Sequence, residues 1–197
     1  MIKENYLKQG MFKLTKKLEI MELLLIILGV FLIPIIIPYV YTGAINSQYI
    51  IGSIVNASLI IAGVNVKGFK KIIGIISLPS IYAIVSGLIF KTASIYMVFM
   101  IPFIWLGNFM IIYLYRYLFV HKKTNYVVAS IISILVKVSI VFISINLLIK
   151  IMAINSNIAL MLKTAMGLNQ LITGILGSFI AFIVIHIIYK RNNKYNY

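Results

Sequence analysis

Residues 126–152 read YVVASIISILVKVSIVFISINLLIKIM, a run of 27 residues whose only charged members are Lys137 and Lys150. A helix needs about 20 consecutive, mostly apolar residues to cross the hydrocarbon core of a bilayer. Lys137 comes eleven residues after Tyr126, which is about 16 Å along a helix and close to the middle of a membrane. The run therefore predicts a membrane-spanning helix with a charged residue at mid-membrane depth.

The whole chain has the composition of a membrane protein. Of its 197 residues, 62% are hydrophobic and 11% are charged, and the mean hydropathy is +1.09. Soluble domains are about half apolar and about one quarter charged. So much apolar surface cannot be hidden inside one small globule, so most of it is expected to face the lipid bilayer. The length suits one compact bundle and leaves no room for a separate soluble domain.

Six stretches of the chain have the length and polarity of membrane-spanning helices. They predict an all-α, polytopic six-helix membrane domain over residues 20–190. A basic cytoplasmic segment, residues 1–19, precedes this domain, and a basic cytoplasmic tail, residues 191–197, follows it. The six predicted helices cover residues 20–41, 49–66, 72–90, 95–119, 126–152 and 164–189.

The connections between these stretches alternate in charge. Three lysines, Lys91, Lys150 and Lys163, fall on one side of the membrane. Because Lys and Arg accumulate on the cytoplasmic side, the pattern predicts a cell-membrane protein with both termini in the cytoplasm. This placement accounts for the net charge of +15, so nucleic acid is not an expected partner. The cations predicted on the cytoplasmic side are Lys3, Lys8, Lys13, Lys16, Lys17, Lys67, Lys70, Lys71, Arg116, Lys122, Lys123, Lys190, Arg191 and Lys194.

Lys137 is the clearest functional candidate, because an ionisable residue at this depth is costly and usually functional. Ser130, Ser133 and Ser144 lie on the same helix face, so this polar stripe is expected to face the bundle interior. In one interpretation Lys137 pairs with an acidic group of a ligand. In the other it is satisfied by backbone carbonyls or hydroxyls. The three acidic residues of the chain all lie near its N-terminus, so an internal salt bridge to Lys137 is not expected.

Asn108 and Trp105 form a second candidate group near the centre of residues 95–119. They lie about one helical turn apart on one face. The pair could offer an amide and an indole to a planar ligand. Equally, Asn108 could form a hydrogen bond to a neighbouring helix, an interaction worth only about 1 kcal/mol.

Asn56 and Gln170 complete the set of candidate substrate-binding residues. Asn56 shares its helix face with Gly52 and Gly63, which slightly favours close helix packing over ligand contact. Gln170 starts a stripe of small residues in the predicted helix 164–189 and could line an outward-facing cavity. That stripe itself is more typical of a packing face than of a site.

The residues that membrane enzymes and ion-coupled pumps need are missing. The chain has no cysteine, two histidines and three acidic residues. Metal-dependent enzymes that act on lipid headgroups need several acids to hold their cations. Proton-coupled carriers usually keep an acid or histidine within the membrane. We therefore expect no catalytic activity, no cofactor and no bound metal.

The chain resembles the substrate-binding S components of energy-coupling factor (ECF) transporters. The resemblance is carried by IVNAS at residues 54–58, MIPFIWLGN at residues 100–108 and LVKV at residues 135–138. S components are similar in size, have six helices and keep both termini inside. The resemblance implies that the chain captures a vitamin or related micronutrient at the outer face. It also implies docking on an ECF transmembrane coupling subunit, which two ATPases drive.

In this family the ligand site lies in the outer half of the bundle, under the outer connections. The resemblance places those connections near residues 42–48, 91–94 and 153–163. The first helix of the family often carries spaced alanines for docking, whereas GVFLI at residues 29–33 has one small residue. The candidate substrate-binding residues are Lys137, Asn108, Trp105, Asn56 and Gln170.

The leading hypothesis is therefore an S component of an ECF-type ABC importer, in which Lys137 favours a ligand with a carboxylate or phosphate. The alternative is a pore-forming or structural oligomeric membrane protein with an anion-favouring polar interior. A membrane enzyme on lipid substrates is a third interpretation, which the shortage of acidic residues disfavours.

Overall fold

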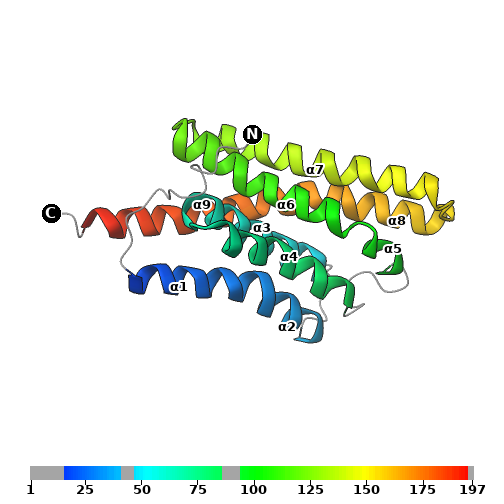
Figure 1. The fold of residues 1–197 in the computed structure, drawn as a ribbon, viewed down its shortest axis with the longest axis horizontal. Coiled ribbons are helices and arrows are strands. Elements are labelled where there is room, and N and C mark those ends of the chain that lie inside the picture. Colours follow the sequence, from blue (N-terminus) through cyan, green and yellow to red (C-terminus); the bar gives the residue numbers. More distant parts are fainter. Residues whose placement is uncertain (1–15, 41–46, 86–93, 195–197) are drawn as a thin grey trace.

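The computed structural model describes residues 16–40, 47–85 and 94–194, and every regular element within them is a helix. This confirms the all-α prediction. The helices lie roughly along one axis (Figure 1). They are α1 (Lys16–Ile27), the π-helix η2 (Leu28–Leu32), α2 (Ile33–Val40), α3 (Ser47–Asn65), α4 (Phe69–Val85), α5 (Ser94–Val98), α6 (Ile101–Tyr115), the π-helix η4 (Arg116–His121), α7 (Tyr126–Ile151), α8 (Ser156–Met166) and α9 (Leu168–Lys194).

Five helices of the described residues are long and apolar enough to cross a membrane, so the chain is a multi-pass membrane protein by length and composition. The predicted third span corresponds to α4, whose 17 residues are fewer than the about 20 that a full crossing needs. Residues 86–90 of that prediction lie outside the described residues, so the count of six stays a prediction. The five spans are Lys16–Ile37, Ser47–Asn65, Ile101–His121, Tyr126–Ile151 and Ser156–Ile187.

Several other predicted segments also fall partly or wholly outside the described residues. Residues 1–15 of the N-terminal segment and residues 195–197 of the tail are not described. The same holds for most of the two predicted outer connections at residues 42–48 and 91–94.

The predicted fourth helix is divided in two. Its first part, α5, ends at Val98, and α6 begins at Ile101. Pro102 is the second residue of α6. Because proline has no backbone N–H, it cannot donate to the carbonyl four residues earlier, and a continuous helix through this point loses a hydrogen bond. The interruption therefore follows from Pro102.

The predicted outer connection at residues 153–163 is mostly helical, which corrects the predicted start of the last span. The helix α8 occupies Ser156–Met166, and α9 follows it after Gly167. Asn155 caps α8, because its side-chain oxygen accepts a hydrogen bond from the backbone N–H of Ile158 at 3.0 Å. Leu162 and Met166 are buried in a small apolar cluster, so packing also stabilises this helix.

The two ends of the bundle are distinct (Figure 1). The start of α1, the C-terminal end of α9 and the junction of η4 with α7 lie at one end. The helices α2 and α5 and the turn from α7 to α8 lie at the other end, so α7 runs nearly the full length of the bundle.

The helix α3 lies in the middle of the bundle, and 12 of its 19 residues are buried. Its closest neighbour is α9, and glycines allow this approach. A Cβ atom at Gly177 would lie 2.7 Å from the Asn56 Cβ and from the Ser53 carbonyl oxygen. A Cβ atom at Gly52 would lie 2.8 Å from the Thr173 Cγ2. These contacts confirm the predicted packing role of the small residues on both helices.

Replacing Gly177 tests this packing. We expect Gly177→Ala to lower the free energy of unfolding by about 1–3 kcal/mol, because the added Cβ meets the α3 backbone, which cannot move aside. Gly74→Ala in α4 is the control, since a Cβ there meets nothing within 4 Å. Thermal unfolding in detergent, followed by circular dichroism, measures both changes. Equal stability of the two variants would show that α3 and α9 do not pack as described.

Candidate ligand-binding site

Lys137 is buried near the middle of α7 and joins a chain of hydrogen bonds across three helices. Its Nζ donates to the Asn56 Oδ1 on α3 at 2.6 Å. The Asn56 Nδ2 donates to the Thr173 Oγ1 on α9 at 3.2 Å, and Thr173 donates to the carbonyl of Gln170 at 3.2 Å. Lys137 and Asn56 are only 5% and 1% exposed. The buried lysine is therefore held by an amide and not by a carboxylate.

The serine stripe beside Lys137 faces the bundle interior, as its spacing predicts. Ser130, Ser133 and Ser144 are all buried. Ser144 donates to the carbonyl of Ile140 at 2.8 Å, a bond within its own helix. The Ser133 Oγ has no hydrogen-bond partner among the described residues.

Asn108 and Trp105 tie α6 to α4, so the interhelical interpretation of these residues is realised. The Asn108 Nδ2 donates to the carbonyl of Ile76 at 3.1 Å. The Trp105 Nε1 donates to the Ser80 Oγ at 2.7 Å. The Asn108 side chain is 2% exposed, and its Oδ1 has no partner in the described part of the chain. That oxygen is an acceptor left open inside the bundle.

A partly open cavity of about 100 Å³, the Lys137 cavity, brings most of the candidate residues together. Lys137, Asn56, Asn108 and Gln170 line it, whereas Trp105 does not and reaches it only through Ser80. A single water needs only about 10–15 Å³ of such space, and drug-sized ligands occupy pockets of about 300–1,000 Å³. The cavity thus has room for a small polar group or for the head of a larger molecule.

The polar groups of the cavity define what an occupant must offer. A lysine ammonium has three donors, and Lys137 uses one of them on Asn56. The Asn108 Oδ1 needs a donor. Among the described residues, no acid lines the cavity. An occupant with an acceptor or negative charge for Lys137 and an N–H or O–H for Asn108 would satisfy both groups.

Arg116 has a role that the sequence pattern does not reveal. The charge pattern counts it among the cations of the predicted cytoplasmic side, and the structure shows that it is buried in the bundle, with 1% of its surface exposed. Its Nε donates to the carbonyl of Gly63 at 2.8 Å. Its Nη2 donates to the carbonyls of Ala62 at 2.9 Å and Val66 at 2.5 Å. Ala62 and Gly63 lie in the last turn of α3 and Val66 directly follows it, where helix carbonyls lack a following turn, although the Ala62 carbonyl also accepts from the Val66 N–H.

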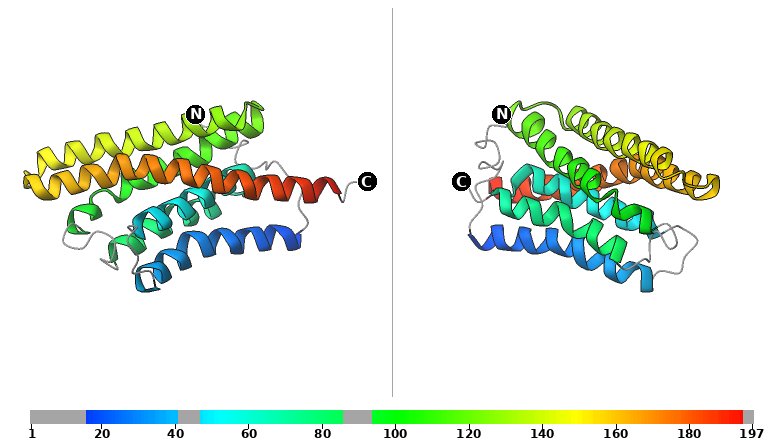
Figure 2. Two further views of the ribbon diagram at one scale, coloured as in Figure 1. Left: turned by 180° about the vertical axis from the view of Figure 1, so that it is seen from behind. Right: turned by 45° about the vertical axis from the view of Figure 1, so that its right-hand side comes forward.

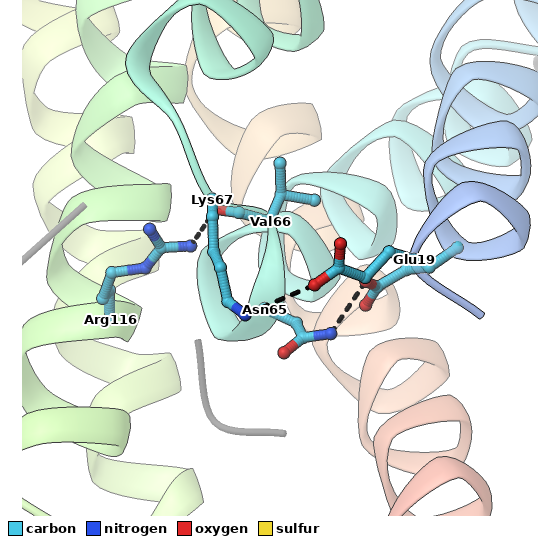
Figure 3. Close-up of polar contacts among 6 residues, drawn as sticks. Glu19, Asn65, Val66, Lys67 and Arg116 are labelled. Carbon is cyan, nitrogen blue, oxygen red and sulfur yellow. Dashed lines mark hydrogen bonds and ion pairs between the residues drawn. The ribbon is translucent and has the colours of Figure 1, made fainter. Parts of the chain in front are cut away.

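The location of Arg116 within the apolar run 95–119 is the signal that points to this role. A cation inside a predicted span needs acceptors inside the protein. The open carbonyls at the end of a neighbouring helix supply acceptors and a partial negative charge. Figure 3 shows the guanidinium turned toward Val66 at the end of α3.

Glu22 lies farther from the start of its helix than the sequence predicts. Since α1 begins at Lys16, four residues before the predicted start, Glu22 is in the interior of the helix, and it is buried. It accepts a hydrogen bond from the Asn65 Nδ2 at 2.8 Å. Nearby, Glu19 and Lys67 form an exposed ion pair at 3.3 Å (Figure 3). These two contacts attach α1 to the end of α3, and neither acid approaches Lys137.

Replacing Arg116 tests its role as a cap on α3. We expect Arg116→Gln to lower the free energy of unfolding by about 1–3 kcal/mol, because buried carbonyls lose a charged donor. Lys70→Gln, at an exposed cation on α4, is the control and is expected to have little effect. Thermal unfolding in detergent measures both. A stable Arg116→Gln variant would exclude the capping role.

Comparison with known proteins reveals no relative: no family model, no curated protein and no solved structure matches this chain. The chemistry of the cavity is therefore inferred from its own donors and acceptors. Lys137 and Asn108 supply the most specific of these.

Proposed function

We propose that this protein is a membrane-embedded substrate-binding (S) component of an ECF-type ABC importer. The observation that carries the proposal is the cavity at mid-membrane depth, where Lys137 and Asn108 keep hydrogen-bonding capacity unused by the described residues. Buried polar groups without partners are rare unless a ligand or water completes them. A small polar ligand would complete these.

The ligand that fits best has a carboxylate, phosphate or carbonyl oxygen next to a donor group. The oxygen would accept from Lys137 and the donor would bond the Asn108 Oδ1. Because the cavity measures about 100 Å³, it would hold only the polar head of a vitamin-sized molecule. The remainder would extend toward the outer end of the bundle, past Gln170.

The transport cycle would depend on partners, because nothing in the site suggests a source of energy. In the proposal the chain docks on an ECF transmembrane coupling subunit with its two ATPases. Gly29 does not offer a small-residue docking surface, since a Cβ there would clash with the Ser58 Oγ inside the bundle. The lipid-facing surface of α1 instead presents large apolar side chains such as Leu24 and Leu25.

The proposal includes six crossings of the cell membrane, with both termini in the cytoplasm. The start of α1 and the end of α9 lie at the same end of the bundle (Figure 1), which supports an even number of crossings. The helix α4 is the element that would complete the six.

Retention of a small molecule tests the binding site. The full chain is purified with the coupling subunits, and its extract is analysed by mass spectrometry. We expect one acidic or carbonyl-bearing micronutrient in wild type and at least about tenfold less in Lys137→Met, because a hydrogen bond to a charged group is lost.

Lys150→Met is the matched control, since Lys150 is exposed on the same helix. It should retain the molecule as wild type does. Equal retention by Lys137→Met would contradict the role of Lys137. Failure to associate with coupling subunits, together with chloride flux in liposomes that contain this chain alone, would favour a pore instead.

Membrane topology can be tested with single cysteines, because the chain has none of its own. We expect Met152→Cys and Lys91→Cys to react with a membrane-impermeant maleimide in intact cells. Lys122→Cys and Lys70→Cys should react only after the cells are permeabilised. Reaction of Lys70→Cys and Lys91→Cys from the same side would exclude a crossing between them, and with it the count of six.

A further inference from the structure

A second, larger space lies between α7 and α9 on the surface of the bundle. It measures about 520 Å³, which is several times the volume of the Lys137 cavity. Along α7 it is edged by the exposed residues Val127, Ile131 and Leu135, and along α9 by Ile175 and Phe179. Ser130, Ile134 and Ser178 form its floor. The space is therefore an apolar groove between two ridges, open to the membrane.

The groove exists because α7 and α9 are in contact near Ile134 and Gly174 and diverge toward Tyr126 at the start of α7. A Cβ atom at Gly174 would lie 2.7 Å from the Ile134 Cγ2, so the helices are close there. Toward the start of α7, the Tyr126 ring lies between them, 5.2 Å from the Phe182 ring between centroids. Figure 2 (left) shows α7 and α9 diverging in this direction. Aromatic bulk therefore holds the two helices apart.

The hydroxyl groups at the floor of the groove need no partner from outside. Tyr126 donates to the Ser178 carbonyl at 2.7 Å, and the Ser178 Oγ donates to the Ser130 Oγ at 2.9 Å. Ser130 donates to the Tyr126 carbonyl at 2.8 Å, and Tyr115 donates to Ser130. All four hydroxyl donors are thus used within the protein. An occupant of the groove needs no polar group, in contrast to an occupant of the Lys137 cavity.

The depth and charge around the groove identify its occupant. From Tyr126 to Leu135 the groove runs nine residues along α7, which is about 14 Å and about half of a hydrocarbon core of roughly 30 Å. The groove thus spans one leaflet. Lys122 and Lys123 are exposed just before Tyr126, and the Lys122 Nζ lies 5.8 Å from the centroid of the Tyr117 ring. In a bilayer this end of the groove would be where that leaflet meets water. The described acids, Glu19 and Glu22, lie on α1 and not beside these lysines.

We propose that this groove binds one acyl chain of an anionic phospholipid, with its phosphate at Lys122 and Lys123. Acyl chains in a groove gain little from the hydrophobic effect, since the surrounding lipid is equally apolar, so close packing and the headgroup charge supply the preference. A helix from a second copy is less suited to this surface, because two copies would bring their exposed lysines close together.

Native mass spectrometry of the full chain tests the proposal. The protein in detergent is titrated with phosphatidylglycerol or with phosphatidylcholine of identical acyl chains. We expect one phosphatidylglycerol to bind at a concentration at least about tenfold lower than phosphatidylcholine. Each of the two lysines is expected to raise the affinity for the anionic lipid about fivefold. The double variant Lys122→Gln/Lys123→Gln should bind both lipids equally. Ile131→Trp should lose the one-lipid species, because the indole fills the groove.

Ile143→Trp is the matched control. Ile143 is 59% exposed on the same helix, against 53% for Ile131, but it does not line the groove. It should bind phosphatidylglycerol as wild type does, and Ile175→Trp repeats the block from the opposite wall. Equal binding of both lipids to wild type, or normal binding to both groove variants, overturns the proposal. The proposal is also overturned if wild type forms a dimer and Ile131→Trp dissociates that dimer, because the groove would then be occupied by a second copy of the chain.

Discussion

A polar group at membrane depth must be satisfied by another protein group, because hydrocarbon offers no hydrogen bonds. In this bundle α3 carries most of that demand. Arg116 binds the carbonyls at its C-terminal end, and Asn65 binds Glu22 of α1. In its middle, Asn56 accepts from Lys137 of α7 and donates to Thr173 of α9. Several of the surrounding helices are thus tied to α3 through specific polar pairs, while buried apolar clusters pack the helices together.

These polar pairs depend on how closely the helix backbones approach. The Asn56 amide reaches Thr173 only because α9 presents glycine at position 177, where a Cβ atom would meet the α3 backbone. Small residues and polar pairs are the two means by which helices associate in a membrane. Here both occur at the same crossing of α3 and α9. The Lys137 cavity lies beside this crossing, so the walls of the candidate site and the core of the bundle are built from the same contacts.

The two spaces of the molecule differ in what they leave unsatisfied. Around the Lys137 cavity, Lys137 has more donors than its one described bond uses, and the Asn108 Oδ1 has no described partner. In the groove between α7 and α9, the hydroxyls of Tyr115, Tyr126 and Ser130 donate within the protein. Because unsatisfied polar groups select polar ligands and satisfied ones do not, the first space suits a polar ligand and the second an acyl chain.

The spacing of apolar residues could predict the helices, and the spacing of Ser130, Ser133 and Lys137 could predict an inward face of α7. Residue spacing could not predict that Asn56, 81 positions away, accepts a hydrogen bond from Lys137. Helical periodicity shows which residues share a helix face, but it does not show which other helix packs against that face. Because Arg116 lies within the predicted span 95–119, the sequence could mark it as a costly cation inside the membrane. For the same reason as with Asn56, the sequence could not predict that its acceptors lie at the end of α3. The charge of Lys163 favoured a connection at residues 153–163. The structure instead has the helix α8 there, which the Asn155 cap and apolar packing stabilise.

The sequence by itself determined that this chain is an all-α, multi-pass membrane protein, because the length and polarity of each run depend only on neighbouring residues. The tertiary structure alone decided which buried groups have partners. It surrounded the Arg116 guanidinium with helix-end carbonyls, held Lys137 on an amide and left the Asn108 oxygen open. Such pairings depend on how separate helices approach one another, and that approach is determined by long-range packing, which local spacing does not contain.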